Sequence, residues 1–386
     1  MSILVRDPLE IGEQAVAVSP EFYWLMLRLD GSRTLFQLQQ EFSSRVGQQI
    51  EREQMLVLLQ QLDALLFLDN ARFRERYRQS LSQFRSRKVR PSKLAGLSYP
   101  ADAVETSRML SSLYVAPDGA GLAATPTRRE VRALVAPHID LRLGGPTYTH
   151  AYRFLRESIL PERFVILGIG HMGLPQYYSI SRKDFETPLG TACCDREFLH
   201  ALDGLLGAGT FGEDLTHRTE HSIEFQVLFL QHLYEDRKFW IVPILTSFSY
   251  HDLLAGPDCE RMTRLLVDAL RGAEEACPKR TCYLASVDLA HLGPRYGDPH
   301  APDASAIAEA LARDRILLEA VARGDSARFV EGIEAERDRR HVCGFSALYA
   351  LLQLNPGMHG QILAHSHCQM DETGSVVTYA SLAFTA

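Results

Sequence analysis

The sequence lacks any long uninterrupted run of apolar residues, and a membrane-spanning helix needs about 18 of them. The opening residues, MSILVRDPLEIGEQ, contain acids where a signal peptide requires an apolar core. The 7 cysteines include no CxxC pair, and an odd set without framework spacing is typical of reduced thiols in the cytoplasm. A net charge of -7 argues against a dedicated nucleic-acid-binding protein. We therefore expect a cytoplasmic protein that has neither a membrane nor a nucleic acid as its partner.

The composition is that of a folded protein with more than one domain. The chain has 386 residues, of which 46% are hydrophobic and 23% charged, and this length is typical of two or three domains. Nine basic residues and a single acid lie between Arg72 and Lys93. This segment predicts a basic linker over residues 76–93, which divides a small domain, residues 1–75, from a large one, residues 94–386.

The first domain contains the signals of a small helical fold with a two-stranded ribbon. Ser19-Pro20 is a helix start with proline at the first helical position, and Thr34 is a suitable N-cap for the helical segment that follows it. A second amphipathic segment spans residues 51–70. Together with the strand-like residues 15–18, these helices predict a winged-helix-like domain.

The second domain has the pattern of an α/β protein. From about Leu94 onward, nearly continuous apolar runs alternate with amphipathic segments. Such alternation is the mark of a sheet that is covered by helices on both faces. Two further strands, QILAHSH and SVVTYASLAF, close the pattern. Helices are expected near residues 148–159, 196–206, 221–234, 260–276, 303–323 and 343–354.

Side chains that can bind a metal or carry a proton follow three of the predicted strands. The run VRALVAP ends in His138, FVILGIG ends in His171, and CYLASV ends in Asp288, with His291 three residues later. The carboxyl ends of parallel strands meet at one edge of a sheet, where such folds bind their ligands. A single histidine at a strand end is usually structural, but agreement among three strands predicts one shared site.

Two of the predicted helices begin at further candidates. His221 opens a helix with Glu224 three residues later, and this pattern could equally be a helix-capping arrangement. Cys343 stands just before another helix, whose N-terminus stabilises a thiolate, so we expect a lowered pKa and a thiol able to bind a soft metal. The other cysteines have no partner at ligand spacing: Cys193, Cys194, Cys259, Cys277, Cys282 and Cys368.

The N-terminal residues resemble the PqqD-like peptide-recognition domain. The shared features are a D-G-x-R-T-L turn, Asp30 to Leu35, and a closing helix, Leu59 to Asn70. Such domains accompany radical SAM enzymes and bind leader peptides by adding a strand to a sheet edge. The resemblance therefore implies a radical SAM protein or a peptide as partner of the N-terminal domain. The alternative is a helical appendage that packs on the main domain.

The larger domain resembles the Memo family, called AmmeMemoRadiSam system protein B in bacteria and archaea. The match covers residues 94–386 and consists of short motifs in the same order as in the family. They are AGLSYP from Ala95, APH from Ala136, ILGIGH from Ile166, ETPLG from Glu186, EHSIE from Glu220, VPIL from Val242, SVDLAH from Ser286, CG from Cys343 and VTYASLAF from Val377.

The Memo resemblance implies a mononuclear metal site with His138, His171 and Cys343 as ligands. The family is similar in fold to the class III extradiol dioxygenases, which use Fe(II). Two histidines and one cysteine suit iron or copper better than magnesium or calcium, and zinc fits the set equally well. The sequence departs from the family at Met172, where a second histidine is usual, and at Asp140, so the small-molecule substrate cannot be carried over.

Three kinds of function are compatible with these residues. The first is a dioxygenase-like redox enzyme that works with a radical SAM partner, in which His291 and His221 act as general acid and base. The D-x-x-H spacing predicts that the carboxylate of Asp288 is hydrogen bonded to the imidazole of His291 and fixes its tautomer. The second is a non-catalytic scaffold that presents a peptide to the radical SAM enzyme. The third is a metal-dependent hydrolase that uses zinc. Because the complete ligand set is present, we favour the redox metalloenzyme.

Overall fold

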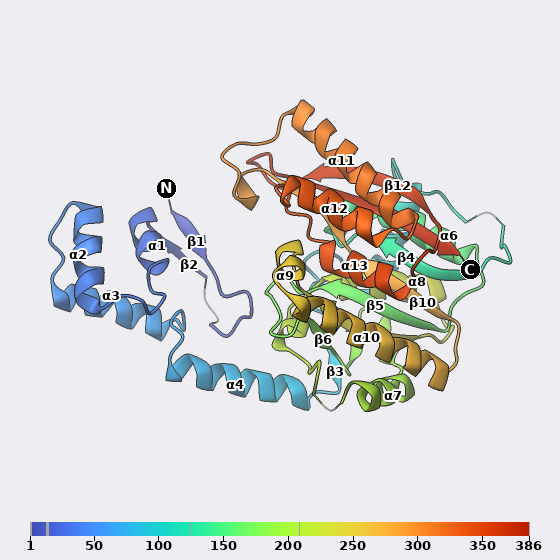
Figure 1. Cartoon of the computed structure of the whole chain (residues 1–386), viewed down its shortest axis with the longest axis horizontal. Coiled ribbons are helices and arrows are strands. Elements are labelled where there is room, and N and C mark those ends of the chain that lie inside the picture. Colours follow the sequence, from blue (N-terminus) through green and yellow to red (C-terminus); the bar gives the residue numbers. More distant parts are fainter. Residues whose placement is uncertain (1, 13–14, 124, 208, 386) are drawn as a thin grey trace. The chain divides into compact units, whose positions relative to one another are not determined.

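The computed structural model describes residues 2–12, 15–123, 125–207 and 209–385, and Figure 1 draws the arrangement of their helices and strands. The chain divides between Ser86 and Arg87 into two compact units. Each unit has a hydrophobic core of its own, and the candidate site residues all belong to the second.

The basic segment expected as a linker, residues 76–93, is regular structure on both sides of this boundary. Helix α4 (Ala71–Ser86) contains its first part, and strand β3 (Val89–Arg90) lies in its second part. Strand β3 pairs in parallel with β7 (Asp184–Thr187) and so belongs to the sheet of the second unit. The boundary between the units thus falls inside the basic segment rather than at either end of it.

The described residues of the first unit form a two-stranded sheet and a set of short helices. Strands β1 (Ile3–Val5) and β2 (Val16–Val18) pair in antiparallel fashion. The side chains of Ser19 and Thr34 accept hydrogen bonds from backbone amides and cap their helices, as the sequence predicted. The helices are α1 (Pro20–Met26), α2 (Leu35–Val46), α3 (Arg52–Ala64) and α4.

The second amphipathic segment of this unit does not remain helical as far as Asn70, which corrects the prediction of a closing helix from Leu59. Helix α3 ends at Ala64, and Leu66 has a positive φ of 63°, a conformation that an α-helix cannot contain. Asn70 accepts a hydrogen bond of 3.1 Å from the amide of Phe73, at the beginning of α4. Residues 65–70 therefore connect two helices.

One mixed sheet forms the centre of the second unit. Its described strands lie in the order β11-β13-β4-β10-β5-β9-β8-β7-β3, with β12 beside β13 and β6 beside β9. Neighbouring strands are parallel from β4 to β8 in this order, whereas β13 runs antiparallel to β4. The bounds are β4 (Val131–Ala136), β5 (Arg163–Ile169), β6 (Tyr178–Ile180), β8 (Gly190–Cys194), β9 (Trp240–Thr246), β10 (Thr281–Ser286), β11 (Asp288–Leu292), β12 (Gly360–Gln369) and β13 (Val376–Thr385).

Most helices of the second unit were expected from the sequence. They are α6 (Leu141–Arg156), α7 (Arg196–Leu206), α8 (Ser222–Tyr234), α10 (Pro257–Ala276), α11 (Ala304–Ala322) and α13 (Phe345–Leu354). Three more were not predicted, α5 (Ala103–Val115), α9 (Tyr250–Leu254) and α12 (Ser326–Glu336). Among the described residues, none of the helices combines the length and the apolar character that crossing a bilayer requires.

Helices cover both faces of the sheet, as the continuous apolar strands predicted. A Cβ atom at Gly168 of β5 would lie 2.7 Å from Ile223 of α8 and 3.2 Å from Leu245 of β9, so these groups share one face. The next residue of β9, Thr246, points to the other face and shares a hydrogen bond of 2.7 Å with Ser346 of α13. Helices α8 and α13 therefore pack on opposite faces.

Helix α6 begins seven residues earlier than predicted, at Leu141, directly after the strand that leads to His138. The sequence 144–146, Gly-Gly-Pro, is typical of a helix break, but here the glycines serve close packing. A Cβ atom at the first glycine would lie 2.2 Å from Ile139, and one at the second would lie 2.7 Å from Leu113. The missing side chains let the first turns of α6 pack tightly beside the site.

Candidate metal centre

Three of the predicted site residues follow three adjacent parallel strands. His138 lies two residues after β4, His171 two residues after β5, and Asp288 two residues after β10. Because β10 lies between β4 and β5, these positions meet at one edge of the sheet, as the strand-end pattern predicted. Cys343 comes from elsewhere, from the turn that precedes α13.

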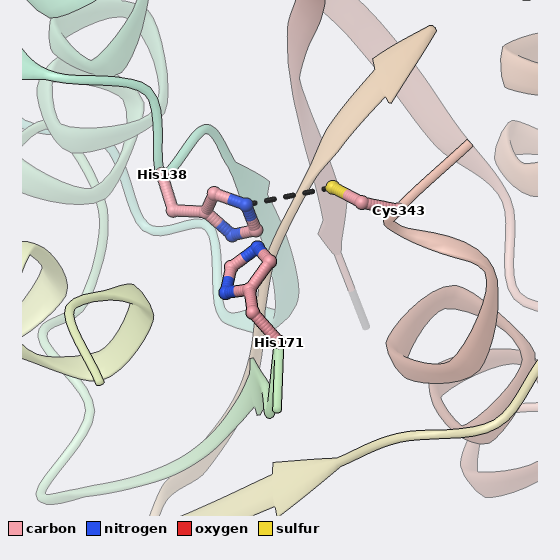
Figure 2. Close-up of side chains that lie close together, drawn as sticks. All are labelled: His138, His171 and Cys343. Atoms are coloured by element: carbon pink, nitrogen blue, oxygen red, sulfur yellow. Dashed lines mark hydrogen bonds between the residues drawn. The ribbon is translucent and has the colours of Figure 1, made fainter. Parts of the chain in front are cut away.

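His138, His171 and Cys343 lie together at this edge, and Figure 2 shows their side chains facing one another. One ligand atom of each, a ring nitrogen or the sulfur, lies within 4.8 Å of the other two. Cys343 Sγ and His138 Nε2 are 3.5 Å apart. Two ligands with bonds of about 2.1 and 2.3 Å at a tetrahedral angle would be about 3.6 Å apart, so this pair has the spacing of two ligands on one ion.

The backbone holds His138 in one orientation. Its Nδ1 lies 2.9 Å from the carbonyl oxygen of Ser286, so Nδ1 carries the proton and Nε2 keeps its lone pair beside Cys343. Burial, together with the nearby His171 and His221, lowers the pKa of His138 well below its usual range. A neutral imidazole with a free Nε2 is the form of histidine that binds a metal.

Glu220 is a residue to which the sequence assigned no role. Its two carboxylate oxygens lie 3.0 Å from Nδ1 of His171 and 3.0 Å from Nδ1 of His221. The same oxygens accept hydrogen bonds from the backbone amides of His171, His221 and Ser222. Burial acts to raise the pKa of Glu220, but the two imidazoles outweigh it and hold that pKa well below its usual range. Glu220 is therefore a carboxylate that fixes both rings and leaves Nε2 of each one free.

His221 stands beside the ligand group without joining it. The centre of its ring lies 5.1 Å from that of His171 and 5.3 Å from that of His138. It occupies the N-cap position of α8 but makes no capping side-chain hydrogen bond, so the capping alternative does not account for it. Burial acts to lower the pKa of His221, and the Glu220 carboxylate outweighs burial, so that the pKa is raised. A histidine with these properties can exchange a proton beside the ligands.

Glu224, the other half of the expected capping pattern, does not cap the helix either. It is fully buried and forms an ion pair with Arg90, which is also fully buried. Arg90 donates a second hydrogen bond, of 2.6 Å, to the carbonyl oxygen of Glu220. The Glu224 oxygens also accept hydrogen bonds from the amides of Lys93 and Leu94 and from the hydroxyl of Tyr99. Glu224 thus joins the segment after β3 to α8.

Asp288 is hydrogen bonded to the backbone of His138, and not to the ring of His291 as predicted. Its Oδ1 accepts hydrogen bonds of 3.0 and 3.1 Å from the amides of His138 and Ile139, and its Oδ2 lies 3.6 Å from Nε2 of His138. Burial raises the pKa of Asp288 to about 7, while the bond from the His138 amide acts against this rise. The expected carboxylate–imidazole pair within the D-x-x-H motif is therefore wrong.

His291 is bonded to the backbone near the ligands. Its Nδ1 lies 3.0 Å from the carbonyl oxygen of Leu289, and its ring meets Tyr296 edge to face. The pairing of β11 with β13 shifts register between Asp288 and His291, so the two side chains do not follow the alternation of a regular strand. Burial lowers the pKa of His291 to about 4, which makes the ring neutral at physiological pH.

The turn that carries Cys343 is anchored by a buried arginine. The guanidinium of Arg340 forms ion pairs with Asp314 of α11 and Glu336 of α12. The carbonyl oxygen of Arg340 accepts a hydrogen bond of 2.7 Å from the amide of His291. Arg340, three residues before Cys343, therefore connects the turn to helices α11 and α12 and to strand β11.

The same turn is conformationally strained. Three residues other than glycine have positive φ angles there: Arg337 at 52°, Asp338 at 48° and His341 at 50°. Each such residue costs on the order of 1 kcal/mol, and strain of this kind persists only where the surroundings impose it. The Arg340 ion pairs are the contacts that impose it next to Cys343.

The prediction that Cys343 has a lowered pKa is wrong for the protein without a metal. Burial, together with the carboxylate of Asp288, raises the pKa of the Cys343 thiol well above its usual range. The thiol also lies 3.5 Å from the carbonyl oxygen of Asp288, as a donor to it. The helix N-terminus does not outweigh these effects. A thiolate at this position therefore needs a cation beside it.

The donor set fits a transition-metal ion. Sulfur and imidazole nitrogen are ligands of iron, copper and zinc, whereas magnesium and calcium prefer oxygen. His138 and His171 each have Nδ1 bonded to an acceptor, which is how metal-binding histidines are held in proteins. A cation among these residues would also supply the positive charge that the partly buried Cys343 thiolate requires. The residues fit several metals, and their geometry does not choose among them.

A pocket of about 560 Å³ opens beside the ligands. His171 and Cys343 form part of its wall, so a molecule bound there would reach the metal-binding group. Its volume is within the range of small-molecule sites. Other lining residues are Tyr177, Phe248, Asp252, Asp338, His341 and Phe345.

Comparison with known proteins gives a consistent family match. The family model described as "Memo-like protein" matches residues 90–383. A MEMO1 family protein of Aquifex aeolicus is 26% identical over 384 residues, which cover 99% of this chain and 95% of that protein. A MEMO1 family protein of Thermus thermophilus is 28% identical over 334 residues, which cover 86% of this chain and 93% of that protein. A MEMO1 family protein of Methanopyrus kandleri is 31% identical over 302 residues, which cover 75% of this chain and 97% of that protein.

Proposed function

This chain belongs to the Memo-like protein family, and from that premise we propose that it is a mononuclear metalloprotein with a dioxygenase-like redox function. His138, His171 and Cys343 would hold iron, with copper as the alternative metal. The observation that carries the proposal is the convergence of these side chains within 4.8 Å from two strand ends and a separate turn. A bound iron or copper ion would supply one-electron chemistry toward dioxygen or a substrate.

The residues around the ligands would position them and exchange protons. His221 would act as the general acid or base, since Glu220 raises its pKa and leaves Nε2 free. Asp288, with a pKa of about 7, would hold His138 through its backbone amide and exchange a proton near neutral pH. His291 would support the Cys343 turn, because its amide donates to the carbonyl oxygen of Arg340.

Metal analysis of anaerobically purified protein tests this function. We expect about one iron or copper ion per chain and an absorption band from charge transfer between thiolate and metal. Cys343→Ala should abolish the band, and Cys368→Ala, at another partly buried cysteine, should leave it unchanged. Protein that binds zinc alone and shows no band would support the hydrolase alternative. Protein that binds no transition metal would overturn the proposal.

The first unit favours a second, compatible role as a peptide-binding module for a radical SAM partner. Its β1–β2 hairpin is a two-stranded sheet, so each strand has an edge that is not used within that sheet. A strand edge with free backbone groups can accept a further strand from a peptide. The unit also has its own core of Leu25, Leu38, Phe42 and Met55, as a separate binding module requires.

Hydrogen exchange of the full-length protein tests this second role. Amide exchange in residues 3–5 or 16–18 should slow when a radical SAM enzyme of the same organism, or its peptide substrate, is added. Leu4→Pro should abolish the protection, because it removes an amide and fixes φ, whereas Leu4→Ala should keep it. Unchanged exchange at both strands in the presence of enzyme and peptide would contradict strand addition.

A further inference from the structure

The pocket beside His171 and Cys343 has two carboxylates on its wall. Asp252 and Asp338 both line it, and among the described residues that form its wall there is no lysine or arginine. Its basic groups are the imidazoles of His171 and His341. A cleft lined by charges of one sign attracts molecules of the opposite charge and repels those of the same charge.

A backbone amide holds Asp338, and the amide and hydroxyl of a serine hold Asp252. Asp338 is partly buried, and its Oδ1 accepts a hydrogen bond of 2.8 Å from the amide of Val342. Asp252 accepts hydrogen bonds of 2.7 and 2.8 Å from the amide and hydroxyl of Ser249. In the part of the chain that the structure describes, neither one forms an ion pair with lysine or arginine. Burial raises the pKa of Asp338, while the Val342 amide and the nearby His341 act against this rise. Both carboxylates line the pocket without an ion pair to any described lysine or arginine.

Asp338 is flanked in the sequence by Arg337 and Arg339, and neither of them lines the pocket. Arg340 does not line it either. It lies two residues after Asp338, but its guanidinium is directed to Asp314 and Glu336. The charges that surround the pocket are thus arranged to favour a positive ligand.

Aromatic rings form the apolar part of the wall. Tyr177 and Phe248 meet edge to face with ring centres 6.1 Å apart, and Phe248 and Phe345 do so at 6.0 Å. Aromatic faces attract organic cations, and carboxylates around an aromatic wall strengthen that preference. The two halves of the wall therefore suit the two halves of one ligand, a charged group and an apolar body.

We propose that this pocket binds an organic cation, an amine or quaternary ammonium group on a small apolar body, and that this cation is the substrate class of the metal centre. The claim that the cation is a substrate rests on the proposed function, whereas the claim that the pocket binds a cation does not. The cationic group faces Asp252 and Asp338, and the apolar body lies against Phe248 and Phe345. Molecules whose recognition depends on a carboxylate or phosphate are excluded.

The test compares two molecules of the same shape that differ by one charge, choline and 3,3-dimethyl-1-butanol. A quaternary ammonium cannot coordinate a metal, so its binding reports on the pocket. We expect choline to bind the full-length protein about five- to tenfold more tightly, measured by ligand-observed NMR, and this ratio to fall as salt is raised. The ratio should approach one in Asp252→Asn with Asp338→Asn, and remain unchanged in Asp236→Asn, an exposed control.

The outcomes separate this inference from the proposed function. Equal binding of the two probes, or a preference that persists in the double variant, would overturn the inference whatever the metal content. If the double variant is unfolded by circular dichroism, Asp338→Asn alone gives the same test, since asparagine can still accept from the Val342 amide. A choline preference in protein that binds no transition metal would uphold cation binding and overturn only the metalloprotein function.

Discussion

Cys343 Sγ lies 3.5 Å from His138 Nε2, although 205 residues separate the two in the sequence. His138 is fixed by the sheet, through Ser286 and Asp288. Cys343 belongs to a strained turn whose position depends on Arg340. The distance between the two proposed ligands is therefore set by contacts far from the ligands themselves, and the first predictions address those contacts.

Glu220→Gln should weaken metal binding while leaving the fold intact. Glutamine keeps the size of the side chain but removes the charge that acts on His171 and His221. Loss of such a supporting carboxylate lowers metal affinity by about 10- to 100-fold. Competition with a chromophoric chelator measures the change, and Glu235→Gln, at an exposed position, is the control. An unchanged affinity would show that Glu220 does not support the ligands.

Asp288→Asn and His291→Ala should have different effects on the metal. Asparagine can still accept from the amide of His138, but it removes a carboxylate 3.6 Å from Nε2, so we expect metal affinity to fall by about tenfold. His291→Ala should leave metal content unchanged, because His291 is not in the group of described residues whose ligand atoms converge within 4.8 Å. Metal analysis decides the point, and loss of metal in His291→Ala would make His291 a ligand.

Arg340→Met should destabilise the second unit and displace Cys343. The substitution leaves Asp314 fully buried without its arginine, and removing one partner of a buried ion pair costs about 3–5 kcal/mol. Denaturant unfolding followed by metal analysis measures both effects. Arg339→Met, at the exposed neighbouring arginine, is the matched control and should match the unmodified protein. A stable Arg340→Met variant with full metal content would contradict the anchoring role.

Two truncations should behave differently although they differ by only four residues. A chain that begins at Arg87 keeps strand β3 and the buried Arg90, and should fold and bind metal. A chain that begins at Pro91 leaves Glu224 buried without its cation, at a cost of about 3–5 kcal/mol. Thermal unfolding and metal content of the two chains provide the comparison. Equal stability would show that the Arg90–Glu224 pair does not hold the unit together.

His217 should make the protein sensitive to acid. Burial lowers its pKa to about 3 in the folded protein, from 6.5 in the unfolded chain. Between these values the unfolded chain binds more protons, so stability falls as the pH drops below 6.5, by about 3 kcal/mol at pH 4. His217→Gln can still donate to the carbonyl oxygen of Ser179 but does not titrate. Its unfolding free energy should therefore decline less between pH 7 and pH 4, as denaturant titrations at each pH will show.

The strand ends could be predicted because their signal is local. A strand buried on both faces is visible as an apolar run, and the run stops where His138, His171 and Asp288 follow. That parallel strands end at one edge is a property of the fold class and not of particular contacts. The positions of these residues at one edge therefore followed from the sequence alone.

The partners of these residues could not be predicted, because they depend on contacts between distant segments. Glu220 and His171 are 49 residues apart, and nothing local to E-H-S-I-E distinguishes a support for two imidazoles from a helix cap. The low pKa expected for Cys343 was wrong for the same reason, because burial by distant segments, together with the carboxylate of Asp288, raises that pKa.

The position of β13 beside β4 has a consequence for how the protein is made. Strand β13 pairs with β4, the strand that leads to His138. Ser381 of β13 donates a hydrogen bond to the carbonyl oxygen of Thr147, which is 234 residues earlier in the sequence. During synthesis, the backbone groups on the β13 side of β4 therefore stay unpaired until β13 has left the ribosome. Contacts of such long range slow folding and prolong the lifetime of aggregation-prone intermediates. Cells that overproduce this protein should therefore need chaperones for the chain to reach its native fold.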